Sequence, residues 1–200
     1  MRAWRVLVFL FSVFPVSTWG QHWAQTADET IWRGKYTNCD KGYAIELPQG
    51  VIAHGSLPPS PNHGILVSGQ APDTTKEVTL DNQRLIGVYD TYDAADYGSA
   101  RAYLKQLLER EGSLQILKYS NNKFHGYPAA YVHFRKTKGN ASLDTEEMVA
   151  YRRSKTDSPI FYVIWVRSTS QSFEQDKKLY EQVRSGFRLL PMPKGQCSND

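Results

Sequence analysis

Two segments carry apolar side chains at the spacing of an amphipathic helix. The first covers residues 99–112, with Ser99 as a suitable N-cap and Gly112 as a suitable stop. Its apolar positions follow the i, i+3, i+4, i+7, i+8 rule: Ala100, Tyr103, Leu104, Leu107 and Leu108. The second segment covers residues 172–186 and ends at Gly186. Each helix is therefore predicted to bury one apolar stripe.

Strand patterns account for much of the remaining chain. Residues 127–136 alternate between apolar and polar, which predicts one packed and one solvated face. Residues 159–168 are apolar on both faces over most of their length, which is typical of a central strand. Further strands, each bounded by turn-forming residues, are predicted at 43–48, 64–69, 84–89, 114–119 and 146–154. The strands after the first helix are predicted to form an antiparallel meander. Residues 50–83 are mostly loop-like, and residues 21–38 form an irregular lead-in.

The first twenty residues differ from the rest of the chain. A basic start precedes an apolar run over residues 6–16, and the small residues Thr18 and Gly20 follow. This layout predicts a secretory signal peptide over residues 1–20, cut before Gln21. The alternative is a membrane anchor, but a spanning helix needs about 20 apolar residues. The predicted location is therefore secreted or periplasmic, with no transmembrane span after cleavage.

Charge argues against a nucleic-acid-binding protein. The net charge is +4 over the whole chain, and two of the arginines lie in the predicted signal peptide. Without them 22 basic side chains face 20 acidic ones, which is too even for a large basic face. No nucleic-acid partner is expected.

The order of predicted elements resembles the PsbP-like family. This family includes the extrinsic photosystem II protein PsbP, a Ran-binding nuclear import factor and exported bacterial proteins of unknown function. The resemblance rests on the opening strand and turn "GYAIELPQG" (residues 42–50), the order of helix and meander, and the closing "YEQVRSGFRLL" (residues 180–190). The aromatic residue that the family usually carries after the proline turn is replaced here by Val51.

The resemblance implies an α+β fold, an α/β/α sandwich whose central, mostly antiparallel sheet is flanked by helices. It implies a single domain over residues 39–191, followed by a C-terminal tail over residues 192–200. It also implies a binding or assembly role. None of the matching motifs is catalytic, so no site residue is carried over from the family.

Cys39 and Cys197 are the only cysteines in the chain. Neither belongs to a CxxC motif, a metal-ligand spacing or a Cys–His signature. In an oxidising compartment two such thiols are predicted to form a structural disulfide. Free or intermolecular thiols are the alternative.

Residues 89–97 interleave acidic and phenolic side chains. The candidates for ligand contact in this segment are Tyr89, Asp90, Tyr92, Asp93, Asp96 and Tyr97. They could bind calcium through their oxygens, or bind a sugar by ring stacking and hydrogen bonds. They could also supply the acid and base of a glycosidase, two carboxyl groups that lie about 5–10 Å apart. The simpler interpretation is structural, because acidic residues suit the end of a strand and the start of a helix.

No catalytic motif stands out in the sequence. It lacks GxSxG, a phosphate-binding glycine loop and any histidine pair at metal-ligand spacing, so no catalytic residue, cofactor or metal is assigned. The five histidines are expected to be solvated. The leading hypothesis is an exported, non-enzymatic module that binds a protein or cell-envelope component, through residues 53–83 and 89–97. The alternative is a secreted or envelope enzyme, similar to a glycan hydrolase, that uses the acids of residues 89–97.

Overall fold

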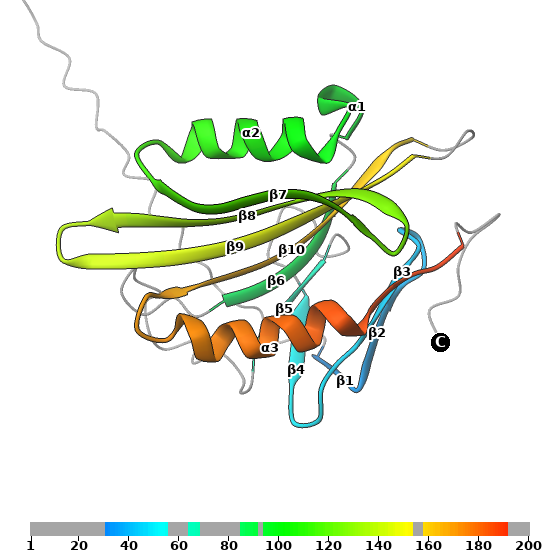
Figure 1. Ribbon diagram of the computed structural model, residues 1–200. Helices are drawn as coiled ribbons and strands as arrows, with labels where there is room; N and C mark the ends of the chain where they lie inside the picture. Colours follow the sequence, from blue (N-terminus) through cyan, green and yellow to red (C-terminus); the bar gives the residue numbers. More distant parts are fainter. Residues whose placement is uncertain (1–30, 56–63, 69–84, 92–93, 154–157, 192–200) are drawn as a thin grey trace, which may run out of the picture.

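The computed structural model describes residues 31–55, 64–68, 85–91, 94–153 and 158–191. Within these ranges the chain forms one large sheet, one small sheet and two long helices (Figure 1). The strands are β1 (Ile31–Arg33), β2 (Lys35–Asn38), β3 (Tyr43–Glu46), β4 (Ile52–Gly55), β5 (Gly64–Ser68), β6 (Leu85–Thr91), β7 (Gln115–Phe124), β8 (Tyr127–Lys138), β9 (Ala141–Arg152), β10 (Ile160–Thr169) and β11 (Phe187–Leu189). The helices are α1 (Ala94–Tyr97), α2 (Ala100–Glu111) and α3 (Phe173–Gly186).

The large sheet is antiparallel throughout and has the order β1-β4-β5-β6-β10-β9-β8-β7. The predicted meander is present as β7-β8-β9-β10, in which each strand pairs with the next along the chain. Strand β10 lies between β9 and β6, near the middle of the sheet, as its apolar character on both faces predicted. The small sheet has the order β11-β3-β2 and brings the two ends of the domain together.

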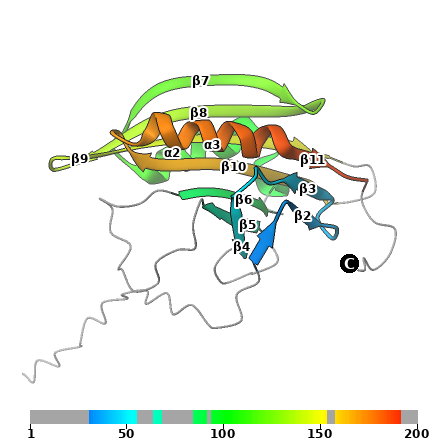
Figure 2. The same cartoon turned by 90° about the horizontal axis from the view of Figure 1, so that it is seen from below.

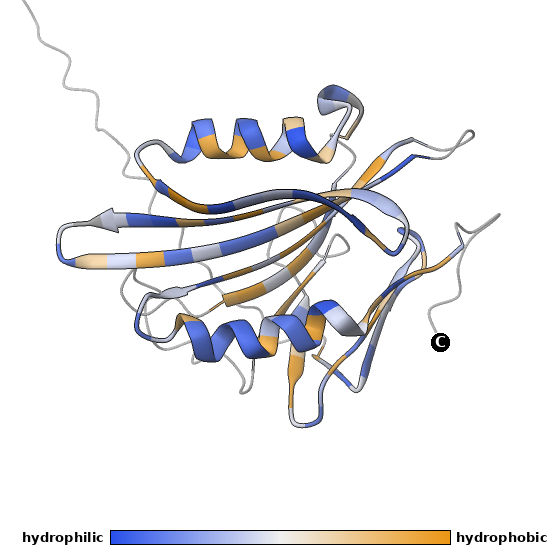
Figure 3. Cartoon of the chain, in the orientation of Figure 1, coloured by the Kyte–Doolittle hydropathy of each residue, from blue (hydrophilic) through white to orange (hydrophobic). Residues whose placement is uncertain are grey.

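Each face of the large sheet supports its own apolar core, because successive side chains of a strand point to opposite faces. Helix α2 packs on one face, where Tyr103 and Leu104 meet Phe134, Val149 and Phe161. Helix α3 and the small sheet pack on the other face, whose core includes Tyr180, Phe187, Ile164, Met148 and Tyr43. Figure 3 shows that both helices carry hydrophilic residues on the side turned away from the sheet.

The predicted α+β class with a mostly antiparallel sheet is confirmed. Sheet predominates over helix, and each long helix covers only part of its face, with α2 on β8 and β9 and α3 on β10. The complete helical layers of the predicted α/β/α sandwich are therefore not confirmed. No helix in the described ranges is both long and apolar enough to cross a membrane.

The predicted irregular lead-in is wrong over its last eight residues, because residues 31–38 form β1 and β2. Trp32 and Tyr36 anchor these strands through an edge-to-face contact with ring centroids 4.9 Å apart. The loop predicted over residues 50–83 likewise contains β4, in which Ile52 is buried. These strands are only three or four residues long, too short for a clear pattern in the sequence, and β1 and β4 pair with each other across about 20 residues.

Strand β7 is longer than the predicted 114–119 and reaches Phe124. Its last residues, which include Ser120 and Lys123, are polar because β7 stands at the end of the strand order and is mostly exposed. Their pairing with β8 is through the main chain and leaves no apolar pattern in the sequence. The predicted signal peptide and C-terminal tail lie outside the described residues.

The predicted ends of the first helix are confirmed. The main-chain N–H of Ala102 donates to Ser99 Oγ at 3.1 Å, so Ser99 caps α2. Gly112 follows the helix with a φ of 77°, a left-handed value that glycine adopts without strain.

Candidate functional site

An open polar groove lies on the sheet face that carries α3, between this helix and strands β7 to β9. We call it the α3 groove; its cavity volume is about 380 Å³. Its polar lining comes from four elements: Lys118, Ser120, Asn122 and Lys123 from β7, Tyr131 from β8, Glu146 from β9, and Lys177, Glu181 and Arg184 from α3.

The groove exists because α3 does not reach the edge of the sheet. The helix packs on β10, whereas β7 and β8 continue beyond it (Figure 2). Strand register places Lys118 opposite His133 and His133 opposite Glu146, so these three side chains share the floor of this face. On α3, Lys177, Glu181 and Arg184 follow i, i+4, i+7 spacing and form its wall.

Cations outnumber carboxylates in the α3 groove. The lining includes four lysine or arginine side chains and two glutamates. Lys118 Nζ lies 5.4 Å from the centroid of the Tyr131 ring, and the Arg184 guanidinium lies 5.4 Å from that of Tyr180. Each of these two cations is held over an aromatic face that favours positive charge. The groove therefore suits an anionic ligand.

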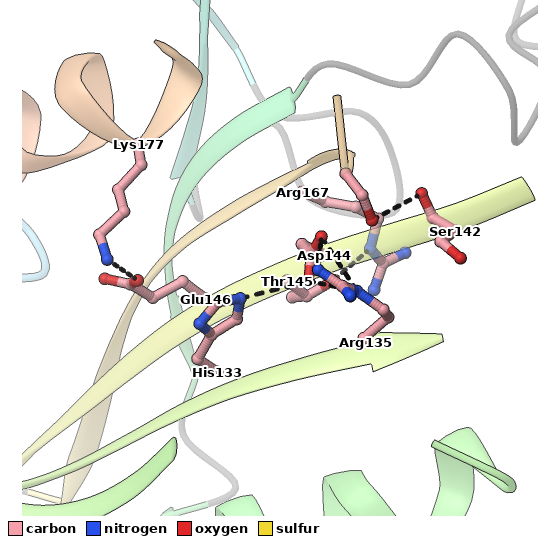
Figure 4. A network of polar contacts seen from close by, with 9 residues as sticks. His133, Arg135, Ser142, Asp144, Thr145, Glu146, Arg167 and Lys177 are labelled. Carbon is pink, nitrogen blue, oxygen red and sulfur yellow. Dashed lines mark hydrogen bonds and ion pairs between the residues drawn. The ribbon is translucent and has the colours of Figure 1, made fainter. Parts of the chain in front are cut away.

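The carboxylate of Glu146 lies at the back of the groove and is only 1% exposed. Lys177 Nζ lies 3.1 Å from Glu146 Oε2 (Figure 4), which compensates this buried carboxylate. Burial raises the pKa of Tyr131 well above its ordinary value, and the hydrogen bond to Glu146 and its charge add to this effect. Tyr131 therefore stays protonated and is a hydrogen-bond donor at physiological pH.

A charged network around Asp144 continues from the groove floor (Figure 4). Arg135 Nε and Nη2 donate to the two Asp144 carboxylate oxygens at 3.1 and 3.0 Å. His133 Nε2 lies 3.3 Å from Asp144 Oδ1, and the His133 ring stacks on Phe173 with centroids 4.7 Å apart. Burial opposes ionisation of Asp144, but hydrogen bonds from Arg135 and Ser170 and nearby positive charge outweigh it, so the pKa is lowered. Asp144 is therefore a fixed anion that organises its neighbours.

The structure separates the candidate residues of segment 89–97. Asp90 is 3% exposed and lies opposite Tyr162 of β10, on the face that carries the small sheet. Tyr89 points to the other face, where its hydroxyl lies 2.7 Å from that of Tyr103. The Tyr97 ring also packs on Tyr103, with centroids 5.3 Å apart.

Asp96 is exposed in α1, while Tyr92 and Asp93 lie outside the described residues. Asp90 is therefore separated from Tyr89 and Tyr97, which both contact Tyr103. Asp90 and Tyr89 are adjacent in a strand, and adjacent strand residues point in opposite directions.

The expectation of solvated histidines is wrong for His54, which is 3% exposed in β4. His133 is half-buried against Phe173, whereas His125 is exposed in the turn between β7 and β8. His22 and His63 lie outside the described residues. Among the described side chains, no group of three or more His, Cys, Asp or Glu could hold a metal ion.

The α3 groove was not identified from the sequence. The polar stripe of Lys177, Glu181 and Arg184 on the second predicted helix was one available signal. The lysines of β7 were another, but only the fold places them opposite that stripe.

Comparison with known proteins identifies the fold. No protein-family model matches the chain, and no curated protein matches it. The fold is similar to that of cyanobacterial PsbP (CyanoP) from Synechocystis sp. PCC 6803, with 15% identity, a TM-score of 0.51, and coverage of 80% of this chain and 92% of that one.

It is also similar to LpqN of Mycobacterium tuberculosis, a protein involved in cell envelope biogenesis, with 13% identity, a TM-score of 0.53, and coverage of 80% of this chain and 92% of that one. The Ran-binding protein Mog1p of Saccharomyces cerevisiae matches with 12% identity, a TM-score of 0.46, and coverage of 80% and 96%. The similarities to CyanoP and LpqN show that this chain has the PsbP-like fold.

Proposed function

We propose that this protein is an exported, non-enzymatic binding module of the periplasm or cell envelope. Its α3 groove binds an acidic region of a protein or envelope component. The observation that carries the proposal is the open groove in which cations outnumber carboxylates, with two of those cations held over tyrosine rings. An envelope role also agrees with the function of LpqN, which shares the fold.

The protonation states near the groove support binding over hydrolysis. A glycoside hydrolase needs one carboxyl group kept protonated as the acid and a second, ionised group about 5–10 Å away. Asp144 has a lowered pKa and is engaged by Arg135, and Glu146 is paired with Lys177. Asp144 is therefore ionised at neutral pH and cannot serve as that acid. The alternative enzyme would use residues 89–97, and nothing in their described placement favours it.

Export and the disulfide belong to the same proposal. Cys39 lies in the turn after β2, and Cys197 lies outside the described residues. The N–H of Leu190 donates to Gly42 O at 2.8 Å, and that of Gly42 donates to Cys39 O at 3.0 Å. Leu190 therefore lies beside the Cys39 turn, and Cys197 follows it by only seven residues. Seven extended residues reach roughly 23 Å, which is more than enough to bring Cys197 back to Cys39.

We expect the exported protein to contain a Cys39–Cys197 disulfide, because both its compartment and the path of the chain favour the pair. Non-reducing peptide mapping should recover the two cysteine peptides as one linked species. Reduction before digestion is the control and should separate them. Recovery of both thiols in alkylated form from the unreduced protein would contradict the prediction.

The groove is tested by affinity capture from the native envelope fraction followed by mass spectrometry. Lys118→Glu combined with Lys123→Glu reverses two exposed charges on β7. Arg101→Glu combined with Lys105→Glu makes the same charge change on exposed positions of α2, on the opposite face. We expect one reproducible envelope partner to bind the wild type and the α2 variant and to be lost with the β7 variant. Raised salt should also release this partner, because exposed charge pairs are screened.

Equal capture of that partner by both double variants would show that the α3 groove is not its binding site. A partner lost equally with both variants would mean that overall charge, rather than the groove, drives the capture. Circular dichroism of each variant provides the check that the fold is retained.

A further inference from the structure

The face of the sheet that carries α2 contains a second, separate cavity. We propose that this cavity binds a small monocarboxylate whose apolar body is about the size of a benzene ring. The site differs from the α3 groove in location and in chemistry. We call it the α2-end pocket, because it lies where α2 ends at Glu111.

The floor of the α2-end pocket is apolar. Phe134 and Leu143 are 1% and 8% exposed and form the floor together with Ala141. Strand register places Phe134 opposite Thr145, and Thr145 opposite Arg167, so these side chains share one face. Helix α2 stops before it covers this end of the β8–β9 hairpin, and the cavity lies there.

The cavity volume of about 200 Å³ sets the size of the ligand. An engineered apolar cavity of about 150 Å³ accepts benzene, so the α2-end pocket has room for a ring of that size and part of a carboxylate. The charged ends of the lining side chains lie at its rim, where the carboxylate would remain.

The rim of the α2-end pocket carries two cations that share one carboxylate. Glu111 Oε2 lies 2.8 Å from Lys136 Nζ, and Glu111 Oε1 lies 3.7 Å from Arg167 Nη2. The first contact has hydrogen-bond length, whereas the second is longer. Glu111 therefore satisfies Lys136 and leaves Arg167 only loosely paired.

The guanidinium of Arg167 is held in position. Its Nε donates to Thr145 Oγ1 at 3.2 Å, and its central carbon lies 5.9 Å from the centroid of the Trp165 ring. Among the described residues, no hydrogen bond is made by its two terminal nitrogens. The 3.7 Å contact of Nη2 with Glu111 is too long for a hydrogen bond, so the planar guanidinium keeps hydrogen-bond donors for a carboxylate.

The charge near Arg167 is not fully balanced by buried acids. Glu147 is a buried carboxyl group on the same face, and its charge interacts with that of Arg167. Burial raises its pKa to about 7, so it is only partly ionised at neutral pH. Lys136 and Arg167 carry two positive charges against the one negative charge of Glu111 and the partial negative charge of Glu147, so a small positive excess remains. This balance, together with the apolar floor, favours a monoanion with an apolar body over a dianion or a cation.

The proposal is tested with benzoate as the probe, by isothermal titration and by amide chemical-shift mapping of the full protein. Benzylamine has the same ring with the opposite charge, and acetate has the same charge without the ring. We expect benzoate to bind and to shift amide signals of β8, β9 and β10 around the pocket. Both controls should bind at least about tenfold more weakly, because benzylamine lacks the carboxylate that pairs with Arg167 and acetate lacks the ring that fills the apolar floor.

Four variants test the parts of the site separately. Arg167→Gln should weaken benzoate binding about tenfold or more, and Ala141→Leu should block it by filling the floor. Glu111→Gln should tighten binding several-fold, because it removes the carboxylate that competes for the two cations. Loss of folding cannot produce that increase. Lys105→Gln, at an exposed position on the same helix, should leave binding unchanged.

The proposal is overturned if no benzoate binding is seen at millimolar concentration, or if benzylamine or acetate binds equally well. It is also overturned if Arg167→Gln has no effect or if Glu111→Gln weakens binding. Lys118→Glu with Lys123→Glu should leave benzoate binding intact, so failure at this pocket is distinguishable from failure at the α3 groove.

Discussion

Replacing Glu147 with glutamine is expected to stabilise the protein against unfolding by about 3 kcal/mol above pH 7, and to have little effect below about pH 4.5. Glu147 is 6% exposed in β9, and among the described residues its Oε1 has no hydrogen-bond partner. Burial raises its pKa from 4.5 to about 7; the positive charge of Arg167 opposes this shift and the negative charge of Glu111 adds to it.

The sign follows from proton binding in the two states. The folded protein holds the Glu147 proton up to about pH 7, whereas the unfolded chain releases it near pH 4.5. The contribution of this group to stability is therefore full below the unfolded pKa and is lost as pH rises through the folded pKa. Glutamine is neutral at every pH and avoids that loss. Urea unfolding of both proteins between pH 4 and pH 8 gives the difference directly.

Glu146→Gln provides the matched control. Glu146 is the next residue along β9 and is also buried, but it points to the other face and is paired with Lys177 at 3.1 Å. Its replacement should destabilise the protein near neutral pH, because Lys177 loses its partner. If Glu147→Gln destabilises the protein at pH 8 as Glu146→Gln does, ionisation of the buried Glu147 does not cost the folded protein stability, and the prediction is wrong.

Gly186→Ala is expected to destabilise the protein by about 2 kcal/mol, although alanine is the better helix former. A Cβ added at Gly186 would lie 2.3 Å from the main-chain oxygen of Glu46. That oxygen belongs to β3 and cannot rotate away as a flexible side chain would. The last turn of α3 would therefore have to move away from the small sheet.

Helix propensity and steric contact predict opposite signs for this variant, so urea unfolding decides between them. Propensity alone predicts a gain of about 1 kcal/mol for alanine in place of glycine. Ser185→Ala, at the exposed neighbouring position, should change stability by less than about 0.5 kcal/mol. A stabilised Gly186→Ala protein would mean that the close approach of α3 to β3 is not as the structure describes.

Gly186 also illustrates how a correct prediction can rest on an incomplete reason. The sequence predicts that the helix ends at Gly186, and α3 does end there. Glycine commonly ends a helix because of its conformational freedom. The residue that follows, Phe187, is extended, and what requires glycine is the main chain of β3, about 140 residues away in sequence.

The candidate site shows the opposite case. The interleaved tyrosines and acids of residues 89–97 looked like one cluster because they are adjacent in sequence. In β6, Asp90 points toward the small sheet and Tyr89 toward α2, since a strand alternates its faces. The α3 groove instead combines residues of β7, β8, β9 and α3, whose proximity no local pattern records.

The sequence by itself determined the local features: the apolar stripe and the Ser99 cap of α2, the central position of β10, and the meander from β7 to β10. These depend on residues within one turn of helix or one strand pair. Only the tertiary structure decided where charge gathers, because α3 stops short of β7 on one face and α2 stops short of the β8–β9 hairpin on the other. Both cavities arise from helix position over the sheet, which depends on the packing of the whole domain.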